Sequence, residues 1–186
     1  MSVDLTVVLD ACVLVPASLR DTLLRLAEKR LFLPRWSDEI VAEMVRTLRQ
    51  KLQKTPEQTA HLTHELRTHF GEAWVENYEQ LIASCTNHEK DRHVLAAAIR
   101  CNAEMIVTYN LRHFSELDLA SWDIAAVHPD DFLIDLFLQD SDLITHTLRE
   151  QAEEIGKNLK AQLKVLNAGL PKFVALISKT LHIDIE

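Results

Sequence analysis

Three short apolar runs, separated by stretches with helical periodicity, most constrain the fold of this 186-residue chain. Residues 5–9, 105–108 and 124–127 are runs of mainly β-branched or aliphatic side chains, typical of strands buried on both faces of a parallel sheet. Alternation of such strands with helices is the pattern of an α/β fold. With only three glycines and five prolines, the chain has little of the turn chemistry that an all-β fold needs.

The stretches between these runs have the apolar spacing of helices. We predict helices over residues 19–33, 37–53 and 55–70, a short helix within 74–82, and a helix over 89–101. Ser37 is the expected N-cap of the second helix, and Pro56 lies where a first helical turn accepts proline. Beyond Pro129 we expect only helices, over residues 131–138, 142–166 and 172–181. One apolar stripe predicts that 142–166 is a single helix.

The composition excludes several classes of protein. With 47% hydrophobic and 26% charged residues, the chain is not disordered or fibrous. The apolar segment at residues 7–15 contains Asp10, so we expect neither a secretion signal nor a membrane span, and hence a cytoplasmic protein with no membrane partner. The odd number of cysteines, Cys12, Cys85 and Cys101, predicts reduced thiols.

The net charge of −8 excludes a uniform positive field that would attract nucleic acid, but the charge is partitioned along the chain. Residues 20–54 carry a net charge of +4, whereas residues 115–154 carry −10. We expect RNA phosphates to be attracted to the first two helices, while the acidic region faces elsewhere or binds a basic partner. The alternative is that both regions are ordinary solvated surfaces.

Asp10 ends the first predicted strand, and Asp91 heads the buried face of a predicted helix. Ligand sites of open α/β sheets lie at the carboxyl ends of strands, where Asp10 and the segment 108–110 both emerge. Carboxylates that converge there repel one another unless a cation neutralises them, and oxygen ligands favour Mg²⁺ or Mn²⁺. Two alternatives remain open: Asp10 is a helix N-cap, or Asp91 is a first-turn acid that the helix dipole favours. Periodicity does not choose among the acids of the second helix, Asp38, Glu39 and Glu43.

Four stretches of the sequence, taken together, resemble the PIN-domain family of metal-dependent ribonucleases. They are Val8–Leu14, Ser37–Leu48, Asp91–Ile99 and Ile106–Phe114, and their order and spacing cover roughly residues 5–135. The resemblance implies a three-layer α/β/α fold with a central parallel sheet, and bacterial members of the family are frequently the toxin of a toxin–antitoxin pair. It implies a nuclease domain over residues 1–138. Residues 139–186 then form a helical extension that packs on this domain, forms a dimer seam or holds a partner helix.

The resemblance assigns metal binding to Asp10, Glu43 and Asp91, and it selects Glu43 over Glu39. The chain departs from the family at the fourth acid, because Asn110 and His113 stand where many relatives carry an acid. Asn110 can coordinate through its carbonyl oxygen but adds no charge, so a second metal ion would be held less firmly. Either one tightly bound ion suffices, or His113 or a later acid such as Asp118 assists.

The leading hypothesis is an endoribonuclease dependent on Mg²⁺ or Mn²⁺ that leaves a 5′-phosphate and a 3′-hydroxyl, as the resemblance implies. Asn110 would orient water or the phosphate, and Thr108 would brace the loop, with His113 as an auxiliary residue. Its expected partners are RNA and an antitoxin protein, and a homodimer is also considered. The candidate RNA-binding residues are Arg20, Arg35, Arg46 and Arg112.

Three other kinds of protein share parts of this pattern. A catalytically weakened PIN-like module would bind RNA or protein without cutting, which Asn110 and the acidic second half motivate. An aspartyl-phosphate phosphatase also needs an aspartate after the first strand, but its second acid is missing because Cys12 occupies that position. A receiver domain would need an acid pair near the first strand and a lysine after a late one, and neither is present.

Overall fold

The computed structural model describes residues 5–185, and its centre is a sheet of four parallel strands. The strands are β1 (Thr6–Leu9), β2 (Leu33–Arg35), β3 (Met105–Val107) and β4 (Ala125–Val127), in the order β2-β1-β3-β4. Val8 of β1 lies opposite Arg35 and Ile106 on its two neighbours. Because β1 is central, Val7, Val8 and Leu9 are all fully buried. The predicted parallel α/β sheet is confirmed, with β2 as a strand that the sequence did not predict.

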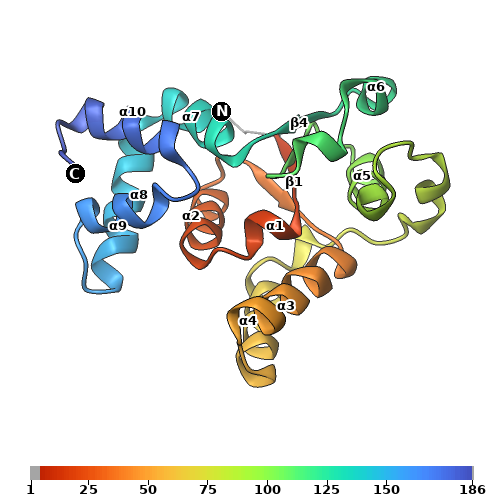
Figure 1. Ribbon diagram of the computed structural model, residues 1–186, viewed down its shortest axis with the longest axis horizontal. Helices are drawn as coiled ribbons and strands as arrows, with labels where there is room; N and C mark the ends of the chain where they lie inside the picture. Colours follow the sequence, from red (N-terminus) through yellow and green to blue (C-terminus); the bar gives the residue numbers. More distant parts are fainter. Residues whose placement is uncertain (1–4, 186) are drawn as a thin grey trace.

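Helices cover both faces of this sheet. Helix α2 (Ala17–Glu28) contacts β2, and α5 (Arg92–Arg100) contacts β1 and β3. Figure 1 shows α2 and α5 on opposite sides of the strands. Helices α3 (Asp38–Leu52) and α4 (Pro56–His69) form a pair below the sheet in that view, and α3 contacts the short helix α1 (Ala11–Leu14). This is the expected three-layer α/β/α arrangement.

The segment between α4 and α5 differs from the prediction. Instead of one short α-helix within residues 74–82, it contains two 3₁₀ helices, Gly71–Ala73 and Glu79–Ser84. Trp74 forms an isolated parallel bridge with Trp36, which extends the line of β2. A third 3₁₀ turn, Glu89–Asp91, leads directly into α5, and Leu111–His113 forms another after β3.

Four helices follow the short helix α6 (Glu116–Leu119) and β4: α7 (Pro129–Gln139), α8 (Ser141–Glu154), α9 (Leu159–Leu166) and α10 (Pro171–Leu181). The prediction of one helix over residues 142–166 is wrong. Gly156 adopts a left-handed conformation with φ of +67°, which ends α8, and the Asn158 side chain then caps α9. Ile155, which the predicted stripe buried, is 58% exposed.

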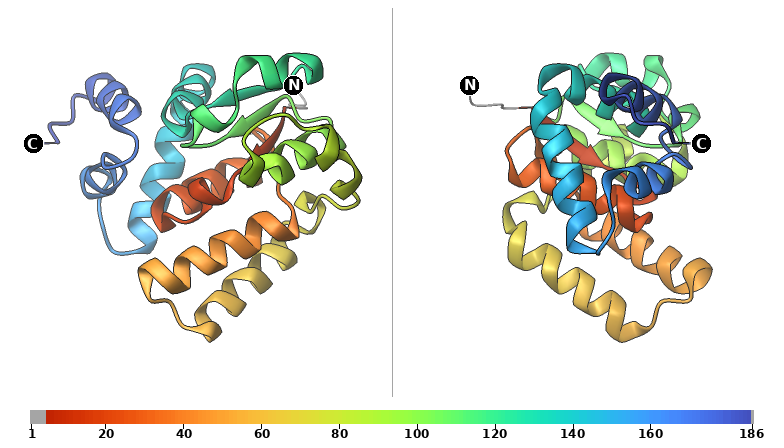
Figure 2. Two further views of the ribbon diagram at one scale, coloured as in Figure 1. Left: turned by 45° about the vertical axis from the view of Figure 1, so that its right-hand side comes forward. Right: turned by 90° about the vertical axis from the view of Figure 1, so that its left-hand side faces the viewer.

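Helices α8, α9 and α10 pack on the preceding part of the chain (Figure 2). The buried hydroxyl of Thr22 in α2 donates a 2.8 Å hydrogen bond to Gln151 of α8. The carboxylate of Asp130, which is 1% exposed, accepts hydrogen bonds of 3.0 and 2.7 Å from the backbone N–H groups of Lys172 and Phe173. These contacts join buried polar groups of the preceding chain to the C-terminal helices.

The expectation that the acidic region faces away from the first basic helix is wrong for α8. Arg25 of α2 forms an ion pair with Glu154 at 2.5 Å, and Lys29 pairs with Glu150 at 2.6 Å. Part of each charged region is therefore neutralised within the molecule. Over residues 5–185, none of the helices combines the length and apolar character that crossing a membrane requires.

Candidate active site

Asp10 lies at the carboxyl end of β1, where the register brings it beside Thr108 at the end of β3. Leu9 is the partner of Val107, and the Asp10 N–H donates to the Val107 carbonyl at 3.1 Å. The buried Thr108 hydroxyl donates to Asp10 Oδ2 at 2.6 Å and accepts the backbone N–H of Asn110 at 3.0 Å. Asp10 precedes α1, but its side chain makes no capping hydrogen bond. The N-cap interpretation of Asp10 therefore fails.

Cys12 completes the surroundings of Asp10. Its Sγ donates to Asp10 Oδ2 at 3.2 Å and accepts the backbone N–H of Tyr109 at 3.3 Å. Burial, together with the negative charge of Asp10, raises the pKa of the Cys12 thiol to about 12. The thiol therefore stays protonated at neutral pH and acts as a hydrogen-bond donor to the carboxylate.

Asp91 lies at the N-terminus of α5, and its carboxylate does not cap that helix. Instead, Asp91 Oδ2 is 2.8 Å from His113 Nδ1 and 3.5 Å from His88 Nδ1. The interpretation of Asp91 as an acid that only stabilises its own helix is thus insufficient. His113 comes from the turn after β3, so this pair joins two segments that are distant in sequence.

Glu43 projects from α3 and shows that the acids influence one another. Burial raises the pKa of its carboxyl group, and so do the negative charges of Asp10 and Asp91, against a partial offset from His93. His93 Nε2 lies 3.6 Å from Glu43 Oε2. Three carboxylates from β1, α3 and α5 therefore lie within electrostatic range of one another, as expected for a cation site.

Residues 6–112 match the family described as "PIN domain", which is more than half of the chain. The chain belongs to the PIN-domain family.

A stretch of 63 residues of this PIN-domain protein is 57% identical to a protein of Mycobacterium tuberculosis (strain ATCC 25618 / H37Rv) named "Putative ribonuclease VapC50". The match covers 34% of this chain and 37% of the length of the mycobacterial protein. No solved structure matches the chain.

A divalent cation suits the acids of this PIN domain, because Asp10, Glu43 and Asp91 offer hard oxygen donors and their mutual repulsion is the kind that such an ion relieves. The three carboxylates are not packed into one tight group. Among residues 5–185, the three potential ligands whose atoms all lie within 4.8 Å of one another are His88, Asp91 and His113.

The remaining predicted site residues are Asn110, Asp118 and four arginines. Asn110 is half-buried and lies two residues beyond Thr108, and its side chain does not cap the turn that follows. Arg46 and Arg112 are exposed, as RNA contacts require. Arg20 and Arg35 are half-buried, and their guanidinium groups donate to nearby carbonyls of the chain. Asp118 bonds to Thr86 and Ser115 rather than to the acids above.

Three residues that lie beside the acids were not predicted from the sequence. They are His88, His93 and Cys12, the last as a donor to Asp10. His93 follows Asp91 by two residues inside a matched stretch, so a buried polar residue on the apolar face of α5 was the available signal. His88 lies outside all four stretches, in a segment without periodicity, and only the fold brings it beside His113.

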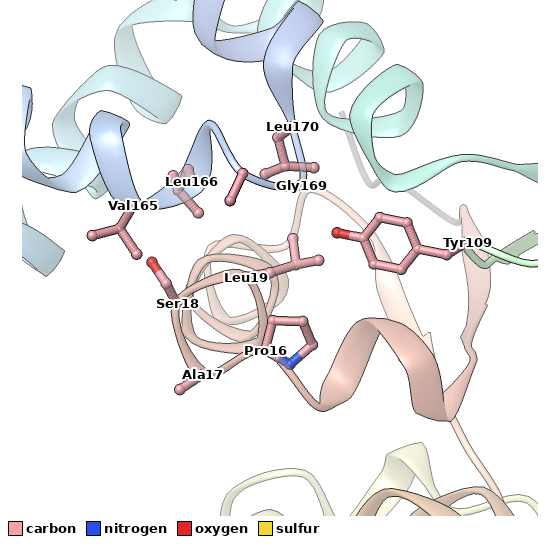
Figure 3. A pocket seen from close by; sticks show the side chains of 10 residues that line it. Pro16, Ala17, Ser18, Leu19, Tyr109, Val165, Leu166, Gly169 and Leu170 are labelled. Atoms are coloured by element: carbon pink, nitrogen blue, oxygen red, sulfur yellow. The ribbon is translucent and has the colours of Figure 1, made fainter. Parts of the chain in front are cut away.

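Tyr109 connects this PIN-domain site to the C-terminal helices (Figure 3). Its side chain extends from the end of β3 toward Gly169 in the loop between α9 and α10, beside a cavity of about 560 Å³. Burial, with smaller contributions from Cys12 and Asp130, raises the pKa of Tyr109 to about 12. The residue that follows Thr108 thus packs against the loop between α9 and α10.

Proposed function

We propose that this protein is an endoribonuclease dependent on Mg²⁺ or Mn²⁺, and that it acts in the cytoplasm as the toxin of a toxin–antitoxin pair. The observation that carries the proposal is the placement of Asp10 at the carboxyl end of β1, where it accepts a hydrogen bond from Thr108 beyond β3. The pKa of Glu43, raised by burial and also by the charges of Asp10 and Asp91, agrees with this placement. Acids from three elements repel one another at the carboxyl end of a parallel sheet, where such folds bind ligands. The family match and the name of the mycobacterial relative support the same assignment.

In this proposal Asp10, Glu43 and Asp91 hold the ion. When bound, a divalent ion supplies charge stabilisation to the phosphate and raises the acidity of a water molecule. Thr108 and Cys12 both donate to Asp10 Oδ2, which fixes the carboxylate and directs Oδ1 away from them. Asn110 presents a neutral amide that can donate to a phosphate oxygen or orient the attacking water. The oxygen of water forms a bond to phosphorus opposite the 3′-oxygen, and the bond between phosphorus and the 3′-oxygen breaks. Water loses a proton to solvent and the leaving 3′-oxygen takes one up, so the products carry a 5′-phosphate and a 3′-hydroxyl.

The test is cleavage of end-labelled RNA by the full-length protein in Mg²⁺ or Mn²⁺, with and without EDTA. We expect cleavage that EDTA abolishes, and a fall of at least about a hundredfold in rate for Asp10→Asn and for Asp91→Asn. Asp142→Asn, which neutralises an exposed acid in the first turn of α8, is the matched control and should cleave like the wild type. Unchanged cleavage in Asp10→Asn would refute the assignment.

A catalytically weakened PIN module is the second candidate, and the neutral Asn110 and the pairing of His113 with Asp91 favour it. This candidate predicts RNA binding without cleavage and weak uptake of Mn²⁺. Calorimetric titration of Mn²⁺ into the full-length protein distinguishes the two candidates. The nuclease should bind Mn²⁺, and Asp10→Asn should weaken that binding.

The proposed pairing with an antitoxin needs its own measurement. We expect this protein to form a stable complex with its antitoxin, and that complex to cleave RNA more slowly than the free chain. Size-exclusion chromatography of the free chain also establishes whether it forms a homodimer. We further propose that residues 1–138 carry the nuclease site and that residues 139–186 form a helical extension that packs on this domain or on a partner.

A further inference from the structure

His88, Asp91 and His113 form a set of donors that differs chemically from the three acids. Asp91 Oδ2 faces both ring nitrogens, at 2.8 Å from His113 Nδ1 and 3.5 Å from His88 Nδ1. The two imidazole rings stack, with centroids 4.2 Å apart and planes inclined by 16°. All three ligand atoms lie within 4.8 Å of one another.

Backbone hydrogen bonds hold these residues together independently of their side chains. The His88 N–H donates to the His113 carbonyl at 3.2 Å, and the Asp91 N–H donates to the His88 carbonyl at 2.9 Å. The segment before α5 is thereby fixed to the turn after β3. The backbone around the ligands is therefore fixed before any ion binds. The side chains must still adjust, because the stacked rings have to turn until one ion lies in both ring planes, and His88 Nδ1 has to release the 3.4 Å hydrogen bond that it accepts from the Lys90 N–H.

The spacing and the chemistry of this set fit a particular class of ion. Zinc bonds of about 2.0–2.2 Å in tetrahedral geometry place neighbouring ligand atoms roughly 3.4 Å apart. The distance between His88 and Asp91 already has that value, while that between His113 and Asp91 must lengthen when an ion replaces the shared proton. Imidazole favours zinc and its neighbours, whereas Mg²⁺ prefers oxygen donors alone.

We propose that His88, Asp91 and His113 bind one divalent transition-metal ion of the zinc class, with water completing its coordination. The site shares Asp91 with the proposed nuclease acids but needs neither Asp10 nor Glu43, so the inference does not rest on the nuclease proposal. His113 Nε2 accepts a 3.3 Å hydrogen bond from Arg112 Nε, which places the proton of the neutral ring on Nδ1. Binding through Nδ1 moves that proton to Nε2 and releases the exposed Arg112 side chain.

Binding of Zn²⁺ to the full-length protein is measured by calorimetry, and Co²⁺ serves as a probe through its visible absorption bands. We expect one Zn²⁺ per chain, and a loss of at least about a hundredfold in affinity for His88→Gln and for His113→Gln, because even outer-shell partners of metal ligands contribute tenfold to a hundredfold. Asp10→Asn should retain the wild-type affinity. His61→Gln, at an exposed histidine 3.9 Å from Glu65 in α4, is the matched control.

Wild-type Zn²⁺ affinity in His88→Gln would overturn the proposal, and so would loss of Zn²⁺ binding in Asp10→Asn, since the ion would then lie among the acids. His88 is exposed, so its substitution should leave folding intact, and far-ultraviolet circular dichroism checks this. The experiments can refute the zinc site and the nuclease proposal independently of each other. Histidine-dependent Zn²⁺ binding without RNA cleavage counts against the nuclease alone, whereas cleavage in Mg²⁺ without that binding counts against the zinc site alone.

Discussion

Glu43 is the residue at which we expect the proposed metal site to lower the stability of the fold. Its carboxyl pKa is raised by burial and by the charges of Asp10 and Asp91, so the folded chain binds this proton more readily than the unfolded chain does. A raised carboxyl pKa lowers stability as the pH increases from the unfolded value, about 4.3, through the folded value. Above that window, the ionised Glu43 opposes folding unless a cation is bound.

Replacing Glu43 by Gln should therefore stabilise the protein in EDTA at pH 7. The amide keeps the size of the side chain and removes the charge that Asp10 and Asp91 repel. We expect a higher thermal unfolding midpoint than that of the wild type at pH 7, and a difference that closes at about pH 3, well below the unfolded pKa, where the wild-type carboxyl is protonated in both states. Circular dichroism at both pH values measures this effect.

The exposed Glu76 provides the control for Glu43, because the same substitution there removes a charge that lies outside the site. Glu76→Gln should not reproduce the pH dependence. If Glu43→Gln were no more stable than the wild type at pH 7, the repulsion among the three acids would be absent.

The acids could be predicted from sequence, but their surroundings could not. Asp10 and Asp91 interrupt apolar elements, and the family resemblance selected Glu43 among the acids of α3. Sequence cannot show that a helix-capping position goes unused, as it does at Asp10 and Asp91. Nor can it pair His88 with His113, because only the packing of two loops creates that contact.

Among the secondary-structure elements, the helices with clear start signals were predicted best. The Ser37 side chain accepts the Ile40 N–H, and Thr55 forms a capping box with Gln58, so α3 and α4 begin where expected. Strand β2 was missed because it has three residues and contains Pro34, which is tolerated since β2 lies at the edge of the sheet. Periodicity carried the predicted helix through Gly156 because the apolar spacing continues on both sides of it.

The loop between α9 and α10 should be sensitive to the smallest added side chain. A Cβ atom at Gly169 would lie 2.6 Å from the Tyr109 hydroxyl oxygen, well inside contact distance. Gly169→Ala must displace that ring or the loop, and such overpacking costs about 1–3 kcal/mol. We expect a lower free energy of unfolding in urea, and recovery of most of the loss in the double variant with Tyr109→Phe, which lacks the hydroxyl.

Gly71→Ala is the matched control, because a Cβ atom there meets nothing within 4 Å. It should leave stability within about 0.5 kcal/mol of the wild type, as surface substitutions usually do. Equal effects of the two glycine substitutions would show that Tyr109 does not pack closely against the extension.

At the scale of the whole molecule, the net charge of −8 hides an internal compensation. Arg25 and Lys29, which belong to the basic first quarter, pair with Glu154 and Glu150 of the acidic half. Each such partly exposed ion pair contributes only about 0–1 kcal/mol to the free energy of unfolding. Their larger consequence is that two cations of α2 are engaged within the molecule, so in the proposed nuclease basic residues elsewhere, such as Arg46 and Arg112, would have to supply phosphate contacts.

The C-terminal helices should be required for the PIN domain to fold. Removing residues 140–186 uncovers Phe137, which packs edge-to-face against Phe173 with centroids 6.2 Å apart. It also leaves the buried Thr22 and Asp130 without their partners in α8 and α10. We expect the 1–139 chain to lose cooperative urea unfolding and to bind a dye that reports exposed apolar surface.

Adding residues 140–186 as a separate chain should restore cooperative unfolding, since the contacts are noncovalent. A chain shortened only after Leu181, at the end of α10, loses the partly buried Ile183 and Ile185 but should keep cooperative unfolding. If the 1–139 chain instead unfolded with the midpoint and slope of the full-length protein, the extension would contribute nothing to this core. Its apolar face would then have to serve a partner, because helices that bury Phe173 and Ile177 need a surface to cover them.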